Sequence, residues 1–189
     1  MSLIPFGFWA ASGAGGGGGA YDLLETTTLA TSASSVTFSG LGSYSDYAHL
    51  QIRAVTRTGV GTYSETLLQF NGDTGSNYST HRLRGNGSNV TSSGWIADTK
   101  IHASSGEQSN SASGAYFAMV LDILDFSSSS KNTTIRSLSG GTGMSNTQDQ
   151  VALTSGVWVN TAAVTSMEFS YSVDFQAGSR FSLYGIKGA

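Results

Sequence analysis

The 189-residue sequence contains no cysteine and a single proline, and only 11% of its residues are charged. Without cysteine the chain has no disulfide, no thiolate-ligated metal and no cysteine nucleophile, so its stability must come from packing or assembly. One proline and the lack of a Gly-X-Y period exclude a collagen-like chain. Runs rich in Glu, Lys and Ala are scarce, which excludes a coiled coil or a large helical bundle. We therefore expect helix to be the minor component of the fold.

The charges that are present sum to a weakly acidic chain. Nine Lys and Arg against twelve Asp and Glu give a net charge of −3. No basic surface is expected that would bind a phosphate backbone, so we expect no nucleic-acid partner. Hydrophobic residues nevertheless reach 39% and aromatic residues 11%, more than is typical of a disordered chain. A chain of this length is expected to form one domain.

The first 20 residues carry no charged side chain and fall into two parts. The apolar head comprises Leu3, Ile4, Pro5, Phe6, Gly7, Phe8 and Trp9. The Gly/Ala tract, residues 10–20, includes five consecutive glycines: Gly15, Gly16, Gly17, Gly18 and Gly19. A signal peptide is disfavoured because no basic residue precedes the head and because Pro5 and Gly7 interrupt it. The head is too short to span a membrane, which takes about 20 apolar residues.

The Gly/Ala tract is typical of a flexible tether, with a root-mean-square span of about 18 Å. Large apolar side chains at the end of a tether favour aggregation unless something covers them. Either the head folds back onto its own domain, or it inserts into a groove on another protein. We interpret residues 1–20 as an arm of the second kind. Its partner-anchoring residues are Leu3, Ile4, Pro5, Phe6, Phe8 and Trp9.

From Tyr21 onward the sequence reads as strands and turns. Apolar and polar residues alternate over 48–54 and 165–175, which is the pattern of strands with one buried face. Asn71-Gly72 and Asn86-Gly87 are typical of tight turns, and the first suggests a hairpin. Further strands are predicted at 94–102, 115–126, 133–139, 151–160 and 180–187. The pattern predicts an all-β fold, an antiparallel β-sandwich that is jelly-roll-like, formed by a single domain over residues 21–189.

The segment 115–126 is more continuously apolar than the other predicted strands. This is expected of a central strand that is covered on both faces. A buried helix of the same length remains the alternative, because a short apolar run does not distinguish the two.

Four motifs, in their order along the chain, carry a resemblance to a known family. They are Tyr21-Asp22-Leu23-Leu24-Glu25-Thr26 with Ser35-Val36-Thr37-Phe38, the segment from Leu68 to Tyr78, and the ending from Ala177 to Lys187. Together they resemble the small β-rich virion surface proteins of tailed bacteriophages, and Ile4 to Trp9 with the Gly run is similar to the amino-terminal heads of many phage structural proteins. The resemblance implies a head-decoration protein, a head fibre, or a tail-fibre or receptor-binding module, commonly trimeric.

Residues suited to catalysis or metal binding are few. His49, His81 and His102 are not joined by any metal-binding spacing. Asp122 and Asp125 form the nearest carboxylate pair, but three residues apart in a strand they point to opposite faces. The loop Asn71–Asn77 resembles a calcium loop faintly, lacks the closing Glu, and is better explained as an Asx-rich turn. We therefore predict no catalytic residue, no metal site and no cofactor.

Aromatic side chains are the remaining candidates for binding. Tyr44, Tyr47 and Trp95 lie near predicted loops and are candidate contacts for a glycan or a partner protein. Trp158, between Val157 and Val159, is expected in the core or at a subunit interface, and the same alternative holds for Trp95.

We expect a non-enzymatic structural protein on the exterior of a tailed-phage virion, held by its arm to other virion proteins and assembled as a homotrimer. A capsid decoration, cement or head-fibre protein is the first hypothesis. The alternative is a tail-fibre or receptor-binding module that contacts host surface glycans. A polysaccharide-degrading enzyme is a third class, which would require two carboxylates facing each other across a cleft.

Overall fold

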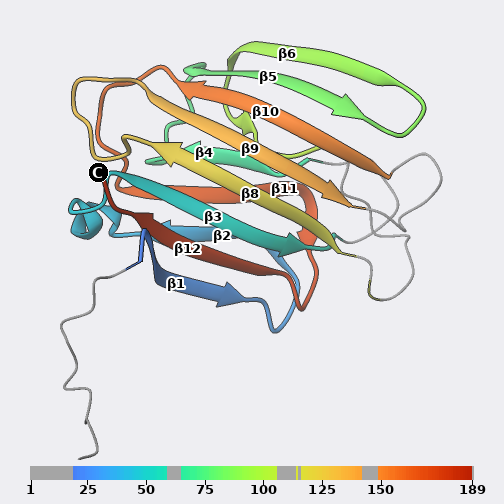
Figure 1. Ribbon diagram of the computed structural model, residues 1–189, viewed down its shortest axis with the longest axis horizontal. Helices are drawn as coiled ribbons and strands as arrows, with labels where there is room; N and C mark the ends of the chain where they lie inside the picture. The colour runs from blue at the N-terminus through green and yellow to red at the C-terminus, as the bar shows by residue number, and fades with distance from the viewer. Residues whose placement is uncertain (1–18, 59–64, 106–113, 115, 142–148, 189) are drawn as a thin grey trace, which may run out of the picture.

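The computed structural model describes residues 19–58, 65–105, 114, 116–141 and 149–188. These residues form two antiparallel sheets packed face to face (Figure 1). The large sheet has the strand order β1 (Tyr21–Thr28), β12 (Arg180–Ile186), β3 (His49–Thr56), β8 (Phe117–Leu124), β9 (Thr133–Gly141), β10 (Gln150–Trp158), β5 (Tyr78–Gly85) and β6 (Val90–Asp98). The small sheet has the order β2 (Ala33–Ser39), β11 (Ser166–Phe175), β4 (Leu67–Phe70) and β7 (Ile101–His102). The predicted all-β sandwich is confirmed.

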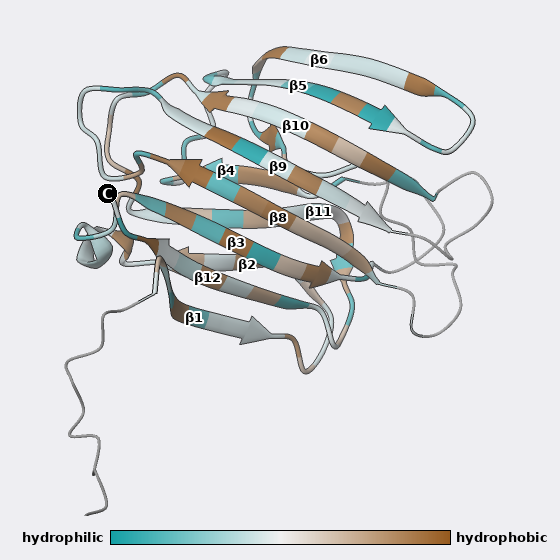
Figure 2. Ribbon diagram, viewed as in Figure 1, coloured by the Kyte–Doolittle hydropathy of each residue, from teal (hydrophilic) through white to brown (hydrophobic). Residues whose placement is uncertain are grey.

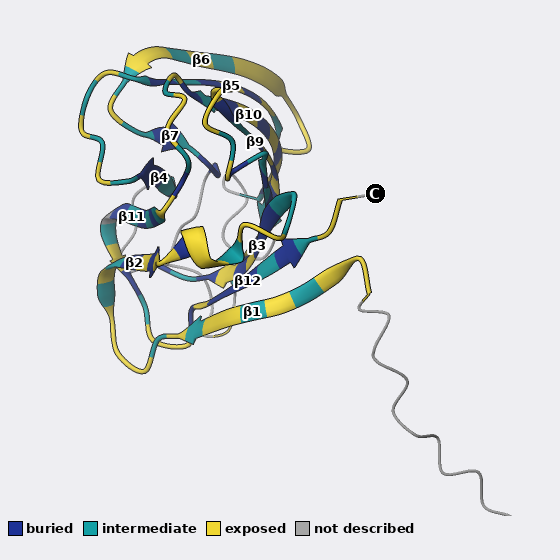
Figure 3. Cartoon of the chain, turned by 90° about the vertical axis from the view of Figure 1, so that its left-hand side faces the viewer, coloured by how far each residue is buried: buried dark blue, intermediate teal, exposed yellow. Residues whose placement is uncertain are grey.

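The core lies between the two sheets, where alternate residues of each strand turn inward. Met167 and Phe169 of β11 are fully buried. Met167 is paired with Phe38 of β2, and the Phe169 ring centroid lies 5.5 Å from that of Phe181 on β12 of the large sheet. Phe169 packs edge-on against Phe38 with ring centroids 6.5 Å apart. Figure 3 shows the buried residues gathered between the sheets, with β1 and β6 as the exposed outer strands of the large sheet. The alternation read from the sequence therefore assigns the inward faces correctly.

The two Asn-Gly turns have different roles. Gly87 (φ 86°) lies in the turn between β5 and β6, which pair as an antiparallel hairpin. Asn71 (φ 52°) and Gly72 (φ 65°) also adopt the left-handed conformation, but their turn joins β4 of the small sheet to β5 of the large sheet. The turn prediction is confirmed at both places, and the hairpin at Asn71-Gly72 is wrong, because this turn is a corner between sheets.

The continuously apolar segment is a strand, so the helix alternative is excluded. β8 pairs with β3 on one side and β9 on the other. Phe117, Met119 and Leu121 point into the core, whereas Ala118 and Val120 are exposed on the outer face of the large sheet. Within the part of the chain that the structure describes, the prediction that both faces of this strand are covered is wrong.

The two ends of the described chain lie next to each other. Tyr21 of β1 is paired with Ile186 of β12, and the backbone amide of Lys187 donates to the carbonyl of Ala20. Residues 1–18, and with them the predicted head and most of the Gly/Ala tract, lie outside the described residues. The predicted division into an arm, 1–20, and a domain, 21–189, stays a prediction. No described helix has the length and apolar character needed to cross a bilayer.

Candidate functional site

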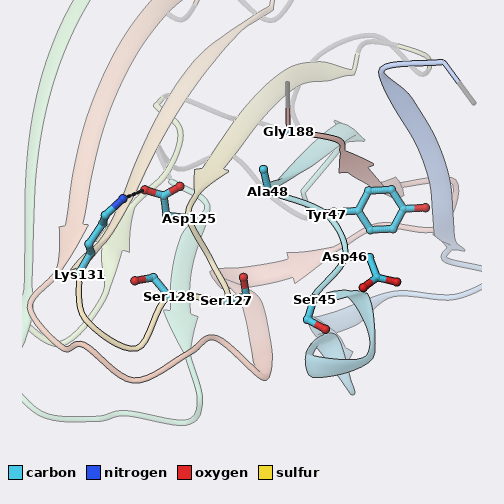
Figure 4. Close-up of a pocket in the computed structure, with 9 residues that line it drawn as sticks. All are labelled: Ser45, Asp46, Tyr47, Ala48, Asp125, Ser127, Ser128, Lys131 and Gly188. Atoms are coloured by element: carbon cyan, nitrogen blue, oxygen red, sulfur yellow. Dashed lines mark hydrogen bonds and ion pairs between the residues drawn. The ribbon is translucent and has the colours of Figure 1, made fainter.

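Tyr47 lies at the rim of a hollow of about 330 Å³ at the end of the sandwich where the termini meet (Figure 4). Its ring lies on the backbone of Gly185, where a Cβ would come within 2.5 Å of the ring. Its hydroxyl donates to Asp22 Oδ2 at 2.9 Å, and Lys187 Nζ is 2.9 Å from the same oxygen. These hydrogen bonds lower the pKa of Asp22, with Lys187 as the larger cause. Tyr47 is thus oriented by β1 and β12.

The hollow itself is polar. Its lining residues are Ser45, Asp46, Tyr47, Ala48, Asp125, Ser127, Ser128, Lys131 and Gly188. Lys131 Nζ lies 2.7 Å from Asp125 Oδ2, and this hydrogen bond lowers the pKa of the carboxyl. Hydroxyls, carboxylates and one ammonium around an open hollow can exchange hydrogen bonds with a polyhydroxylated ligand. The Tyr47 hydroxyl points away from Lys131 (Figure 4), so the centre of the hollow has no aromatic floor.

The other two predicted contact residues do not join Tyr47 in one site. Tyr44 ends a short 3-10 helix, Leu41–Tyr44, and packs against the core. Trp95 belongs to β6, at the opposite edge of the large sheet from β1 (Figure 1). Leu3, Ile4, Pro5, Phe6, Phe8, Trp9 and Gly15 to Gly18 lie outside the described residues, and Gly19 is exposed. The candidate glycan contacts are therefore split between two distant places.

Trp95 belongs instead to a cluster that sequence reasoning missed, formed by Glu65, Arg82, Trp95, Asp98 and His102; we call it the Arg82 cluster. Arg82 of β5 is 5% exposed, bonds Glu65 Oε1 at 2.6 Å and donates to the Ser104 carbonyl at 2.9 Å. His102 of β7 contacts Glu65 through Nδ1 and Asp98 Oδ2 through Nε2, the latter at 3.1 Å. The Trp95 ring stacks on His102 with centroids 4.1 Å apart and has the Arg82 guanidinium 4.6 Å away.

Charge pairing controls protonation in the Arg82 cluster. Burial alone would lower the pKa of His102, but the hydrogen bonds that its ring donates to Glu65 and Asp98 outweigh burial and raise this pKa. Burial alone would raise the pKa of Glu65, but its bonds to His102 and Arg82 outweigh burial and lower it. Both imidazole nitrogens are occupied by carboxylates. The cluster therefore favours the imidazolium form of His102 and joins β6 to the small sheet.

One signal for this cluster was present in the sequence. Tyr78, Thr80 and Arg82 alternate along β5 and share its buried face. A charged side chain on a buried face requires partners of opposite charge. The partners come from other segments, so strand periodicity does not identify them.

The remaining candidates for catalysis and metal binding are separated. Asp122 Oδ1 accepts from Gln51 Nε2 at 2.8 Å, whereas Asp125 pairs with Lys131. Asp73, in the suspected calcium loop, accepts hydrogen bonds from Gly75, Asn77 and the Trp158 indole. Within the described ranges, no group of three or more His, Asp or Glu is arranged to hold a metal ion. Trp158 is 1% exposed, so its predicted place in the core is confirmed.

The outer faces of the two sheets differ in chemistry. The outer face of the small sheet is mostly polar and presents Ser35, Thr37, Ser39, Glu168 and Ser170, with Leu67 half-buried among them. The outer face of the large sheet carries an apolar stripe, which we define as Val55, Leu83, Val90, Ala118, Val120, Leu138, Val151 and Leu153. Figure 2 shows hydrophobic segments recurring along β3, β8 and β10 of this sheet. One side of the sandwich is thus suited to water and the other to a protein surface.

Comparisons with known proteins identify no family. No family model matches the chain, and no curated protein matches its sequence. Among solved structures it is similar to the alginate lyase Aly36B, in a complex with alginate tetrasaccharide. The two chains are 12% identical over 87% of this chain and 80% of that chain, with a TM-score of 0.28.

This likeness corrects one expectation. The prediction that the chain is not an enzyme is wrong as stated, because the similar structure is that of an enzyme. A β-sandwich is a scaffold that carries catalytic groups as well as binding surfaces, and a missing sequence motif does not exclude catalysis. At this identity and TM-score the likeness assigns no activity to the chain.

Proposed function

We propose that the protein is a structural component of the exterior of a tailed-phage particle, a capsid decoration, cement or head-fibre protein. The observation that carries the proposal is the contrast between the polar outer face of the small sheet and the apolar stripe on the large sheet. A decoration protein needs one face toward water and another against protein. The motifs between Tyr21 and Lys187 that resemble phage surface proteins support the same assignment.

In this proposal the arm attaches the sandwich to another virion protein. Burying Ile4, Phe6, Phe8 and Trp9 in a groove contributes about 1.5–3 kcal/mol for each side chain before ordering costs. An oligomer presents several such arms, and their effects multiply because each arm after the first binds intramolecularly. Ala20 and Tyr21, where the arm joins the sandwich, lie beside the end of β12, so the oligomer would meet its partner with that end.

Copy number in purified particles tests the assignment. Quantitative mass spectrometry against the major capsid protein is expected to give hundreds of copies for a decoration protein. A few dozen copies or fewer would indicate a position in the tail instead. Complete absence from particles would refute a virion role.

Attachment through the arm is tested separately with the full chain. The variant Phe6→Ser/Phe8→Ser/Trp9→Ser is expected to stay off the particle, because the head loses its apolar side chains. Its matched control, Ala10→Ser/Ala11→Ser/Ala14→Ser, changes the neighbouring tract and is expected to attach normally. Normal attachment of the head variant would contradict the anchoring role.

The second candidate is a tail-fibre or receptor-binding module, favoured by the polar hollow beside Tyr47. Its serine hydroxyls and the Asp125–Lys131 pair are suited to the hydroxyl groups of a host glycan. Glycan-array binding that is lost in Asp125→Asn/Lys131→Ala and kept in Arg84→Ala, a change outside the hollow, would favour this candidate. Together with a low copy number, that result would replace the first proposal.

A further inference from the structure

We propose that the apolar stripe is a self-association surface, which packs against the same stripe of a second copy of this chain. The inference deepens the proposed function, since it names the partner of the face on which that function rests.

The pattern of β8 is that of a strand with protein on both sides. Phe117, Met119 and Leu121 fill the core, and Ala118 and Val120 between them are also apolar. Continuous apolar runs of this kind occur in strands that are buried on both faces. The described residues cover only the inner face, so the sequence of β8 fits an assembly better than an isolated sandwich.

The side chains of the stripe lie in two adjacent rows that cross the strands in register. One row joins Val120, Leu138, Leu153 and Leu83, on β8, β9, β10 and β5. The other row joins Val55, Ala118, Gly140, Val151, Gly85 and Val90. Because side chains two residues apart share one face, both rows form a single surface.

The stripe is large enough to matter energetically. Its valines and leucines range from 36% exposed at Val55 to 74% at Val90, with Leu138 and Leu153 at 56%. Their summed exposed area amounts to several hundred Å², the range in which apolar patches mark interaction sites. A standard interface buries about 800 Å² on each partner, so the stripe supplies much of the apolar centre of one.

Charged groups border the stripe and are held by their own chain. The Arg53 guanidinium lies 4.8 Å from the Tyr184 ring centroid and its Nε donates to Gln51 Oε1 at 2.9 Å. Arg136 lies 3.8 Å from Asp122 on the neighbouring strand. An apolar centre with a polar rim is the anatomy of a protein–protein interface. Because these rim arginines have partners within the chain, a symmetric copy can approach without leaving them unpaired.

The shape favours a second sheet over an extended arm as the occupant. A single extended segment lying on a sheet face would bury its own amide and carbonyl groups without hydrogen-bond partners. A sheet has these groups paired internally, and two sheets pack face to face about 10 Å apart. A hollow of about 300 Å³ around Gly140, bounded by Val120, Leu138 and Val151, has room for an apolar side chain of the second copy.

Sedimentation equilibrium of the full chain over a range of concentrations tests the inference. The unmodified chain is expected to form a dimer, because a stripe that packs against itself relates two copies by a twofold axis. Leu138→Ser/Leu153→Ser is expected to weaken association by about a hundredfold, because it removes the centre of the stripe. Leu23→Ser is the matched control, since Leu23 is 59% exposed on β1, at the far edge of the same sheet. It is expected to associate normally.

A cross-linking experiment avoids any loss of folding in the serine variant. The chain contains no cysteine, so Leu138→Cys introduces the only thiol. A short bis-maleimide is expected to join two copies of Leu138→Cys efficiently and to leave Leu23→Cys monomeric.

Three outcomes would overturn the inference. They are a monomer at every concentration, an oligomer unaffected by Leu138→Ser/Leu153→Ser, and an oligomer abolished instead by Phe8→Ser/Trp9→Ser, which would make the arm the contact. None of them removes the protein from the virion, whereas absence from purified particles would refute the proposed function and leave self-association in solution intact.

Discussion

The hydrogen bond between Trp158 and Asp73 gives a buried indole N–H its acceptor. The indole Nε1 donates to Asp73 Oδ2 at 2.7 Å, and the Trp158 ring packs on Phe70 and Tyr78. This bond is the first cause of the lowered pKa of Asp73, with Asn77 and the Gly75 amide adding to it. The loop that resembles a calcium site in sequence thus supplies the hydrogen-bond acceptor for the indole N–H of buried Trp158.

Replacing Asp73→Ala is expected to lower the free energy of unfolding by about 1–3 kcal/mol, because the buried indole N–H loses its acceptor. Urea denaturation followed by tryptophan fluorescence measures this. Asp174→Ala removes an exposed carboxylate and is expected to change little. Equal stability of the two variants would show that the Asp73–Trp158 bond is not needed.

The Arg82 cluster gives stability a dependence on pH. Because the folded pKa of His102 is raised, its contribution is complete below the unfolded value of about 6.5 and is lost as pH rises through the folded value. Glu65 and Asp98 have lowered pKa values, so their contribution is complete above about pH 4 and is lost as pH falls. Stability is expected to be greatest between these limits.

Chemical denaturation between pH 3 and pH 9 measures that profile. His102→Gln is expected to remove the decline on the alkaline side, while His81→Gln, at an exposed position of β5, keeps it. An unchanged alkaline decline of stability in His102→Gln would contradict this role of the imidazolium.

Among single residues, the sequence predicted the place of Trp158 in the core. It could not predict that Glu65, Arg82 and His102 lie together, because they come from three separate segments.

Strands were the most predictable elements, because a period of two identifies a half-buried strand without knowledge of its neighbours. β11 was found in this way close to its observed bounds. The corner at Asn71-Gly72 was mistaken for a hairpin because local turn chemistry is the same whether the chain returns to its own sheet or crosses to the other. β8 was assigned two covered faces because the sequence shows that a face is apolar, not which molecule covers it.

Gly156 of β10 sets the distance between the large sheet and β7. A Cβ at this position would lie 2.8 Å from Ile101 Cγ2 and 3.1 Å from Ile135 Cγ1. Gly156→Ala is therefore expected to cost about 1–3 kcal/mol of unfolding free energy through overpacking. Gly42→Ala, where nothing lies within 4 Å of the added Cβ, serves as the control. Thermal unfolding of both variants measures the loss of stability. An unchanged stability of Gly156→Ala would mean that the strands move apart to accommodate the added methyl group.

At the scale of the whole molecule, the two outer faces divide the sandwich into a wet side and an apolar side. If the apolar stripe joins copies, the melting temperature Tm of the unmodified protein is expected to rise with protein concentration, because association stabilises the folded state by mass action. Differential scanning calorimetry over about a hundredfold range of protein concentration measures this rise in Tm. Leu138→Ser/Leu153→Ser is expected to melt at a temperature independent of concentration. The same rise in both proteins would place the contact elsewhere.

The pairing of Tyr21 with Ile186 brings both ends of the described chain to one end of the sandwich. The turn between β5 and β6 lies toward the opposite end (Figure 1). A peptide epitope grafted between Asn86 and Asn89 would therefore project away from the ends of the chain. Exposed tight turns tolerate insertions well. This geometry makes the β5–β6 turn the natural place for a displayed peptide, whereas a tag fused after Lys187 would lie beside Ala20 and Tyr21.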